Sequence, residues 1–163
     1  MQLLLGLGGN LGDPPVAFRA ALGALAGRHP LLAVSRLYRS RPVGPPQPRY
    51  WNLVALLELG GPLLDLLGQC QALEVEAGRD RSREARWGSR PLDLDLLAAD
   101  GIVHRGPRLE LPHPRFGVRA FVLVPAAELT PEWRLAGAGR TVAELACEVS
   151  PGDDVEPCGR LDL

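Results

Sequence analysis

The sequence predicts a single α+β domain in which an antiparallel sheet carries two helices on one face. Short apolar segments bounded by glycine and proline alternate with two segments whose apolar residues recur at helical spacing. In chain order these segments read strand, helix, strand, strand, helix and strand. The length of 163 residues is that of one domain, so residues 1–163 are expected to fold as one unit.

The first three elements occupy the N-terminal quarter of the chain. Gln2–Gly9 is an apolar segment that runs into GLGGNLGD, whose glycines miss the dinucleotide-binding spacing and therefore favour a tight turn over a phosphate cradle. Asp13 is a suitable N-cap and Pro14 a suitable first residue for a helix that ends near Gly27. Leu31–Tyr38 is predicted to return as the second strand.

A long loop separates this strand from the next two elements. Arg39–Arg49 holds four prolines and cannot be regular structure, so it is either a functional lid or a rigid surface loop. Tyr50–Leu59 is the predicted third strand. Pro62 begins the second helix, in which Gln71 and Glu74 share a polar edge that would ordinarily face solvent.

The last strand of the six is Leu92–Leu97, which alternates apolar and acidic residues. This period places Asp93 and Asp95 on one face, about 6.6 Å apart along the strand, and the leucines in the core. Two neighbouring carboxylates repel each other unless a cation lies between them. Mg²⁺ prefers such oxygen ligands, and the pair can hold two ions as in two-metal phosphoryl transfer. The competing interpretation is a solvated strand face that carries Asp twice.

Additional elements are expected after this strand. They are a hairpin that returns through Ile102–Leu111, a strand at Ala120–Val124, and a short helix opened by a capping box of Thr141 and Glu144. The βαββαβ order of the first six elements is that of a ferredoxin-like domain, with the hairpin and helix as C-terminal additions. Its helix-free sheet face is open to ligands.

Composition excludes several classes of function. The net charge of −1 argues against nucleic-acid or membrane partners, and no apolar run is long enough for a membrane helix. All 18 basic residues are arginine, which excludes a P-loop lysine and a Schiff-base lysine. Three scattered cysteines fit a reducing compartment. With no leader segment recognisable after Met1, a cytoplasmic protein is expected.

Five arginines lie between Arg79 and Arg90, directly before the paired aspartates. One or two cations at a helix C-terminus need no special explanation. Arginine side chains, however, bind phosphate oxygens in a bidentate manner, and Mg²⁺ on carboxylates supplies the complementary ion. Together the two segments predict a polyphosphate site.

Six segments resemble the 6-hydroxymethyl-7,8-dihydropterin pyrophosphokinase family of folate biosynthesis, in order and over nearly the whole chain. They are GLGGNLGD, LYRSRPVGP, YWN, the stretch 71–78 with the arginines after it, RWGSRPLDLDLL and LPHPRFGVRAFVL. The resemblance implies an ATP-dependent pyrophosphokinase. Such an enzyme transfers pyrophosphate from ATP to the hydroxymethyl group of the pterin and releases AMP. ATP is then a co-substrate, and two Mg²⁺ ions are expected.

The resemblance also implies residue roles. Asp93 and Asp95 match the metal ligands and, with Arg81 and Arg90, form the implied catalytic set. The residues that match nucleotide-binding positions are Gln71, Glu74, Arg81, Arg83, Arg90, Leu96, Arg108, His113 and Arg119. The residues that match pterin-binding positions are Ser40, Arg41, Val43, Tyr50, Asn52, Trp87 and Phe121. A monomer acting on ATP and a reduced pterin is expected.

The chain departs from the family pattern at three places. The segment between Gly78 and Trp87 is one residue longer, so the phosphate-binding role falls to Arg81 or Arg83. Arg41 stands where a small residue or proline is expected, and Pro114 where an aromatic residue is common.

Two other classes of function remain open. A two-metal nucleotidyl or phosphoryl transferase would keep the aspartates but would not need Tyr50, Asn52 and Phe121. A non-catalytic RNA-binding module on the same fold would need exposed aromatic residues and a basic surface, whereas aromatic content is 5%.

Overall fold

The computed structural model describes residues 1–80, 82, 88–149 and 154–163. Its elements are β1 (Gln2–Gly9), α1 (Pro14–Ala26), β2 (Leu31–Val34), β3 (Leu37–Ser40), β4 (Tyr50–Glu58), α2 (Leu63–Glu76), β5 (Asp93–Ala99), β6 (His104–Arg105), β7 (Glu110–Leu111), the 3₁₀ turn η1 (Phe116–Val118), α3 (Ala120–Leu129), α4 (Val142–Glu148) and β8 (Glu156–Gly159). None of the helices in these ranges is long and apolar enough to cross a membrane.

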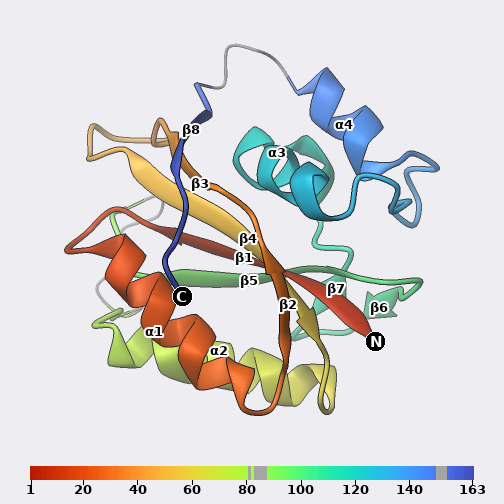
Figure 1. Ribbon diagram of the computed structural model, residues 1–163, viewed down its shortest axis with the longest axis horizontal. Helices are drawn as coiled ribbons and strands as arrows, with labels where there is room; N and C mark the ends of the chain where they lie inside the picture. The colour runs from red at the N-terminus through yellow and green to blue at the C-terminus, as the bar shows by residue number, and fades with distance from the viewer. Residues whose placement is uncertain (81, 83–87, 150–153) are drawn as a thin grey trace.

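The main sheet has the strand order β5-β1-β4-β3-β8, and β2 also pairs with β4. All of these pairings are antiparallel. Helices α1 and α2 lie together on one face of the sheet (Figure 1). The predicted α+β class with a ferredoxin-like core is therefore confirmed.

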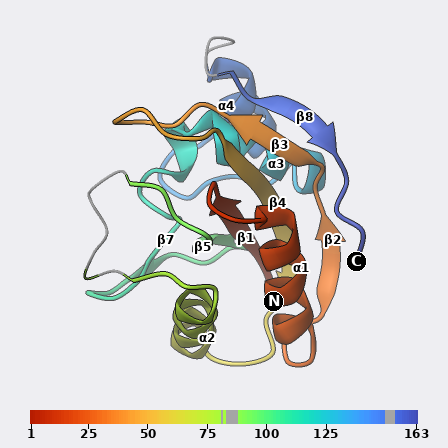
Figure 2. The same ribbon diagram turned by 90° about the vertical axis from the view of Figure 1, so that its left-hand side faces the viewer.

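Strand β1 shows how the two faces of the sheet differ. Leu3, Leu5 and Leu7 point into the core beneath α1 and α2, where each buried leucine contributes about 1.5–3 kcal/mol. The alternate positions are Leu4, Gly6 and Gly8. Leu4 belongs to a second core beneath α3 and α4, which cover only part of that face (Figures 1 and 2). Gly6 is covered by the side chain of Leu97, which would lie 3.3 Å from a Cβ atom there, whereas Gly8 is only partly buried. The face is therefore open beside Gly8 and the start of β5.

The predicted strand Leu31–Tyr38 is two strands, because the ladder is interrupted at Ser35. The Ser35 backbone NH donates to the carbonyl of Val54, and the Ser35 hydroxyl accepts from the Val54 backbone NH at 3.0 Å. This side-chain bond replaces a backbone bond and allows the chain to change direction. β2 then pairs with the C-terminal half of β4, and β3 with its N-terminal half.

The predicted strand at Ala120–Val124 is wrong, because this segment begins helix α3. Its β-branched and aromatic residues favour a strand locally, but the helix packs Val122, Leu123 and Ala126 into the second core. Tertiary packing overrides the local preference, even with Pro125 inside the helix.

The C-terminal elements differ from expectation in two further ways. The segment Ile102–Leu111 does not extend the main sheet, because β6 and β7 pair with each other in a separate two-stranded sheet. Strand β8 was not predicted, and it pairs with β3 at the sheet edge. The predicted N-cap Asp13 and the capping box of Thr141 and Glu144 are both present.

Candidate active site

Three neighbouring strands place Asp93, Gly8 and Asn52 in one row on the open face. Gly8 of β1 pairs with Asp93 of β5 on one side and with Asn52 of β4 on the other. Directly paired residues point to the same face of a sheet. A Cβ atom at Gly8 would lie 3.7 Å from Asn52 Oδ1 and 4.0 Å from Asp93 Cβ. The missing side chain therefore leaves a gap between the carboxylate and the amide.

The second aspartate lies on the same face, opposite another glycine. Asp95 pairs with Gly6, and the intervening Leu94 is buried in the core with Leu92, as the alternation predicts. Burial, and next the charge of Asp93, raise the pKa of Asp95 to about 6. A carboxylate that is held beside another carboxylate in this way is a suitable ligand for a divalent cation, whose charge removes the repulsion.

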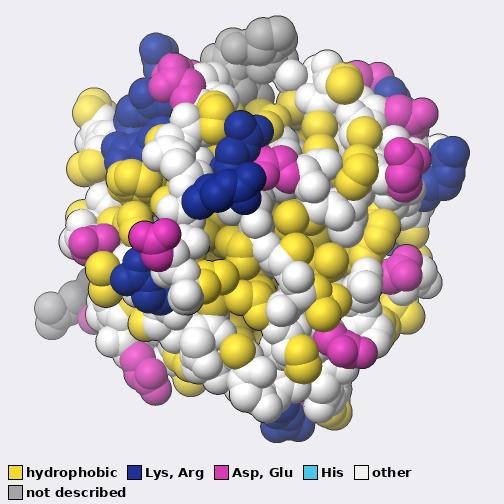
Figure 3. All heavy atoms as spheres, in the orientation of Figure 1, with side chains coloured by type: hydrophobic (Ala, Val, Ile, Leu, Met, Phe, Trp, Pro, Cys, Tyr) yellow, Lys and Arg dark blue, Asp and Glu magenta, His cyan; other side chains and the backbone are white. Residues whose placement is uncertain are grey.

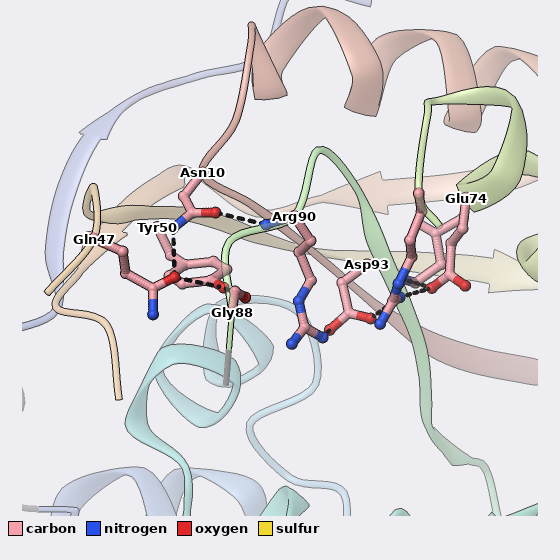
Figure 4. A network of polar contacts seen from close by, with 9 residues as sticks. Asn10, Gln47, Tyr50, Glu74, Gly88, Arg90 and Asp93 are labelled. Atoms are coloured by element: carbon pink, nitrogen blue, oxygen red, sulfur yellow. Dashed lines mark hydrogen bonds and ion pairs between the residues drawn. The ribbon is translucent and has the colours of Figure 1, made fainter. Parts of the chain in front are cut away.

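Two guanidinium groups lie on the carboxylate of Asp93 (Figure 4). Arg90 Nη1 donates to Asp93 Oδ2 at 3.1 Å, and Arg79 Nη1 donates to Asp93 Oδ1. Arg79 is buried, whereas Asp93 is about a quarter exposed on its side chain. The arginines bind both oxygen atoms of this carboxylate, so a metal ion at Asp93 would share these oxygens with the arginines or displace one of them.

Glu74 lies behind Arg79 and is almost completely buried, at 1% exposure. Its Oε1 accepts from Arg79 Nη1 at 2.6 Å and from the backbone NH of Leu94 at 2.9 Å. The expectation of a solvated edge shared by Gln71 and Glu74 is therefore wrong for Glu74. Arg79, five residues along the chain, returns over the end of α2 and neutralises its charge.

A cavity of about 460 Å³ lies on the open face and is lined in part by Arg90, which binds Asp93. This volume lies within the range of small-molecule sites. Four segments form its walls: the end of β3 with the loop after it, the start of β4, the segment before β5, and the η1–α3 corner. The lining residues are Ser40, Arg41, Pro42, Val43, Tyr50, Asn52, Arg90, Arg115, Val118, Arg119, Ala120 and Phe121.

Hydrogen bonds hold the polar side chains of this cavity. Asn52 Nδ2 donates to the hydroxyl of Ser40 at 2.8 Å, and both residues are buried. The Tyr50 hydroxyl donates to the carbonyl of Gly88 at 2.8 Å. Phe121, on α3, has the guanidinium of Arg119 5.4 Å from its ring centroid. The cavity thus combines two aromatic rings with one fixed amide.

Asn10 connects the two loops beside the cavity (Figure 4). Its Nδ2 donates to Gln47 Oε1 at 3.0 Å and to the Pro48 carbonyl at 2.9 Å, and its Oδ1 accepts from the Arg90 backbone NH at 2.9 Å. The Pro48 carbonyl requires a donor and the Arg90 NH an acceptor, which determines the orientation of the amide. The end of β1 therefore joins the proline-rich loop to the segment that carries Arg90.

His113 and Arg119 lie on the segment that enters α3. The His113 backbone NH donates to the Leu97 carbonyl at 2.7 Å, and its Nδ1 accepts from the backbone NH of Arg115 at 3.1 Å. Burial, followed by the charges of Arg119 and Arg115, lowers the pKa of His113. The imidazole is therefore neutral at pH 7.

The structure brings many of the predicted site residues together. The cavity is lined by Ser40, Arg41, Val43, Tyr50, Asn52, Phe121, Arg90 and Arg119. Other predicted nucleotide residues lie outside it: Leu96 is in the core, while Gln71 and Arg108 are exposed. Three predicted residues, Arg81, Arg83 and Trp87, lie outside the residues that the structure describes.

Arg79 and Asn10 are prominent in the structure, although the sequence predictions assigned neither of them a role. Arg79 was one of five arginines, and its only distinguishing signal is the preceding Gly78, whose φ of 94° turns the chain back over α2. Asn10 stands in the GLGGNLGD segment. The glycines of this segment predict a tight turn, and they give no signal for a role of the Asn10 amide.

A model of the 7,8-dihydro-6-hydroxymethylpterin-pyrophosphokinase (HPPK) family matches residues 4–131. Curated relatives named 2-amino-4-hydroxy-6-hydroxymethyldihydropteridine pyrophosphokinase are similar over most of their length. The relative from Pseudomonas aeruginosa is 46% identical over 148 residues, which cover 88% of this chain and 89% of that one. The relative from Synechocystis is 38% identical over 152 residues, which cover 90% of this chain and 75% of that one.

Solved structures of HPPK-DHPS from Plasmodium falciparum share the fold. The wild-type structure has a TM-score of 0.67 at 13% identity and covers 90% of this chain. A variant solved with pteroate has a TM-score of 0.69 at 10% identity and covers 99% of this chain. This chain spans 40% and 48% of those two chains, less than half of each.

Proposed function

The chain belongs to the 7,8-dihydro-6-hydroxymethylpterin-pyrophosphokinase family, and from this membership we propose which of its residues bind the pterin, the nucleotide and the metal ions. As a member of this family it is an enzyme that transfers pyrophosphate from ATP to the hydroxymethyl group of 6-hydroxymethyl-7,8-dihydropterin. AMP is the other product, and the step belongs to folate biosynthesis.

One observation carries the assignment of residues. The cavity that holds Tyr50, Asn52 and Phe121 is also lined by Arg90, which binds Asp93, and only the bare Gly8 separates Asn52 from Asp93 across the sheet. A flat heterocycle in the cavity can therefore present a substituent toward the aspartates.

The pterin is proposed to lie in the cavity. Tyr50 and Phe121 supply aromatic faces for the ring, and stacking of this kind adds about 0.5–1.5 kcal/mol beyond area burial. Asn52 is held by Ser40, so its remaining polar atoms are in place to bind the ring edge. Val43 and Arg41 close the cavity on the side of the proline-rich loop. Trp87 is proposed to complete it.

The triphosphate is proposed to lie beside the aspartates, held by arginine. Arg90 and Arg119 both line the cavity, and the charges of Asp93 and Asp95 both act on Arg119. A guanidinium binds phosphate oxygens as a bidentate donor. The other proposed nucleotide contacts are Gln71, Arg81, Arg83, Leu96, Arg108 and His113. Glu74, which is buried, is proposed to act on the nucleotide through Arg79, whose guanidinium it positions.

Asp93 and Asp95 are proposed to hold two Mg²⁺ ions. The donor set fits, because both ligands are carboxylates, and burial beside the charge of Asp93 raises the pKa of Asp95 to about 6. Among the described residues no three His, Cys, Asp or Glu side chains cluster as a complete metal site. Mg²⁺ often takes one or two carboxylates and completes its shell with water and phosphate. When bound, the ions neutralise phosphate charge and lower the pKa of the attacking hydroxyl.

The protein residues supply position and charge rather than a strong base. Binding of both substrates places the pterin hydroxyl in line with the β-phosphorus, and arginines stabilise the charge that develops on the phosphate oxygens. His113 is neutral and is held by backbone contacts at its Nδ1 and amide NH. The loops at 39–49 and 79–90 are proposed to exclude water, so that ATP is not hydrolysed.

The direct test is incubation with ATP, Mg²⁺ and the reduced pterin alcohol. AMP and the pterin diphosphate are expected in equal amounts, and no AMP is expected without the pterin. ADP as product would indicate a different phosphoryl transferase. The enzyme is further proposed to be a cytoplasmic monomer that forms one domain and binds no nucleic acid.

A further inference from the structure

We propose that Asp154, on the C-terminal segment that ends in β8, is a positioning residue of the pterin cavity. This inference rests on the proposed function, because it concerns the same cavity. Asp154 lies outside residues 4–131, to which the family model matches. Its partner Arg41 is a residue at which the sequence departs from the family pattern.

The carboxylate of Asp154 contacts both ends of the loop that follows β3. Arg41, the first residue after β3, donates from Nε to Asp154 Oδ2. Arg49, the last residue before β4, has its Nη2 3.5 Å from the same oxygen and donates to the Asp154 carbonyl at 3.1 Å. One residue therefore bridges the two arginines at the base of the loop.

This loop forms one wall of the cavity. Arg41, Pro42 and Val43 line it, and the residues that flank the loop, Ser40 and Tyr50, line it as well. The β3–β4 ladder, in which Ser40 pairs with Tyr50, holds the base of the loop. The bridge through Asp154 adds a side-chain connection just beyond the last ladder pair, so it reduces the number of positions that Arg41 and the wall can take.

Strand β8 holds Asp154 in place. Its residues pair with β3 in an antiparallel ladder in which Glu156 lies opposite Arg39. Asp154 itself has a φ of 50°, a left-handed conformation that Asp and Asn tolerate better than other side chains. In the space-filling view, basic and acidic side chains lie next to one another over the region of β3 and β8 (Figure 3).

The charges make the role of Asp154 specific. Arg41 and Arg49 are like charges at the two ends of a short loop, and they repel each other unless an anion lies between them. The Asp154 side chain is 20% exposed and lies against Arg49, which is 35% exposed, whereas Arg41 is 76% exposed. Solvent therefore screens the Arg49 side of the bridge less than the Arg41 side. Among the described residues, the one ion pair of Glu156 is with Arg49, at 3.5 Å, and the Glu156 side chain is 63% exposed.

The test compares Asp154→Asn with the control Glu156→Gln. Asn keeps the size of the side chain and its tolerance of a positive φ, and it removes only the charge. Calorimetry of the pterin alcohol in the presence of a non-hydrolysable ATP analogue and Mg²⁺ should show about threefold to tenfold weaker binding for Asp154→Asn. Binding of the analogue itself should change less than about twofold, and Glu156→Gln should behave as wild type.

Two further readouts separate positioning from general destabilisation. In steady-state kinetics Asp154→Asn should raise KM for the pterin and leave kcat unchanged. Because the pterin alcohol carries no net charge, added salt should weaken its binding to the wild type but not to Asp154→Asn. In combination with Arg41→Gln, the losses should be less than additive.

The outcomes distinguish this inference from the proposed function. If Asn52→Ala leaves pterin binding unchanged, the pterin is not in this cavity and the proposed function fails. If Asn52→Ala weakens binding while Asp154→Asn matches wild type in pterin affinity, KM and salt response, the positioning role is overturned alone. Equal losses for the pterin and the ATP analogue in Asp154→Asn would also overturn it.

Discussion

The two halves of the site are held together by different forces. On the pterin side, two polar side chains have neutral partners: Asn52 binds Ser40, and Tyr50 binds a backbone carbonyl. On the phosphate side, charges are paired with charges: Asp93 holds Arg79 and Arg90. We expect the neutral contacts to persist when MgATP binds, because MgATP does not compete for them. The charged contacts use the groups that MgATP also binds.

This difference indicates which half responds to a ligand. MgATP brings phosphates for the arginines and cations for the aspartates, so its binding exchanges internal ion pairs for external ones. The pterin side is connected to that exchange by Asn10, which binds both the proline-rich loop and the backbone of Arg90. Substitutions in the two halves should therefore have different consequences for folding and for binding.

The largest effect is expected for Arg79→Met, which removes the cation from the buried Glu74. A buried charge without a partner costs about 3–5 kcal/mol in the free energy of unfolding. Urea denaturation without Mg²⁺ measures this loss. Arg90→Met should cost much less, since Asp93 is partly exposed and keeps Arg79.

A matched double variant tests the cause. Adding Glu74→Gln to Arg79→Met removes the orphaned charge and should recover a large part of the lost stability. If Arg79→Met is destabilised by less than about 1 kcal/mol, the buried pair is not the support assigned to it.

Asp95→Ala should leave folding intact but reduce turnover at least about 100-fold, the scale for loss of a major charge-stabilising group. The measurement is AMP formation at saturating ATP, pterin and Mg²⁺, with circular dichroism as the control for folding. Near-wild-type turnover would remove Asp95 from the catalytic set.

The same residue should make stability depend on pH in metal-free buffer. The pKa of Asp95 is raised from 3.8 to about 6 in the folded protein, so the folded state holds its proton more tightly than the unfolded state. The resulting penalty is absent below about pH 4, grows as the pH rises to 6 and is complete above that. Asp95→Asn should therefore be more stable than wild type at pH 8, but not at pH 3.5.

Mg²⁺ supplies the control for this comparison. At pH 8 it should raise the melting temperature of the wild type and leave that of Asp95→Asn nearly unchanged. An advantage of Asp95→Asn that is equally large at pH 3.5 and pH 8 would show that charge is not its source.

A smaller effect is expected for the aromatic residues of the pterin side. Tyr50→Ala and Phe121→Ala should each weaken pterin binding by about tenfold, since stacking adds about 0.5–1.5 kcal/mol to the lost contact area. Affinity for an ATP analogue should be preserved. Calorimetry of each ligand decides the point, and equal losses for both ligands would identify the rings as core residues.

Much of the fold followed from local patterns, and the exceptions have physical reasons. Gln2–Gly9 and the two helices with their N-terminal residues were predictable because period and capping are local signals. Ala120–Val124 was predicted to be a strand because its residues favour strands locally. The segment is helical because packing against the sheet stabilises the helix. β8 contains a proline and no buried residue, so it had no strand pattern to detect.

The site was predictable where residues act through their own chemistry. Asp93 and Asp95 were predictable from the alternation of apolar and acidic residues, and the cavity residues from the resemblance to a family. Glu74 and Arg79 were not predictable in their actual roles, because a helical pattern cannot show that a cation from the following turn will bury a carboxylate. Asp154 depends on a pairing across 113 positions, which no local pattern reports.

The central claim is that the phosphate half is completed by its ligand and that this change reaches the pterin half. Titration of the pterin alcohol by calorimetry, with and without a non-hydrolysable ATP analogue and Mg²⁺, tests it most directly. The account predicts pterin binding at least about fivefold tighter with the nucleotide present, and an equal gain for the nucleotide when pterin is bound first. Equal pterin affinity for the empty and the nucleotide-bound enzyme would contradict it.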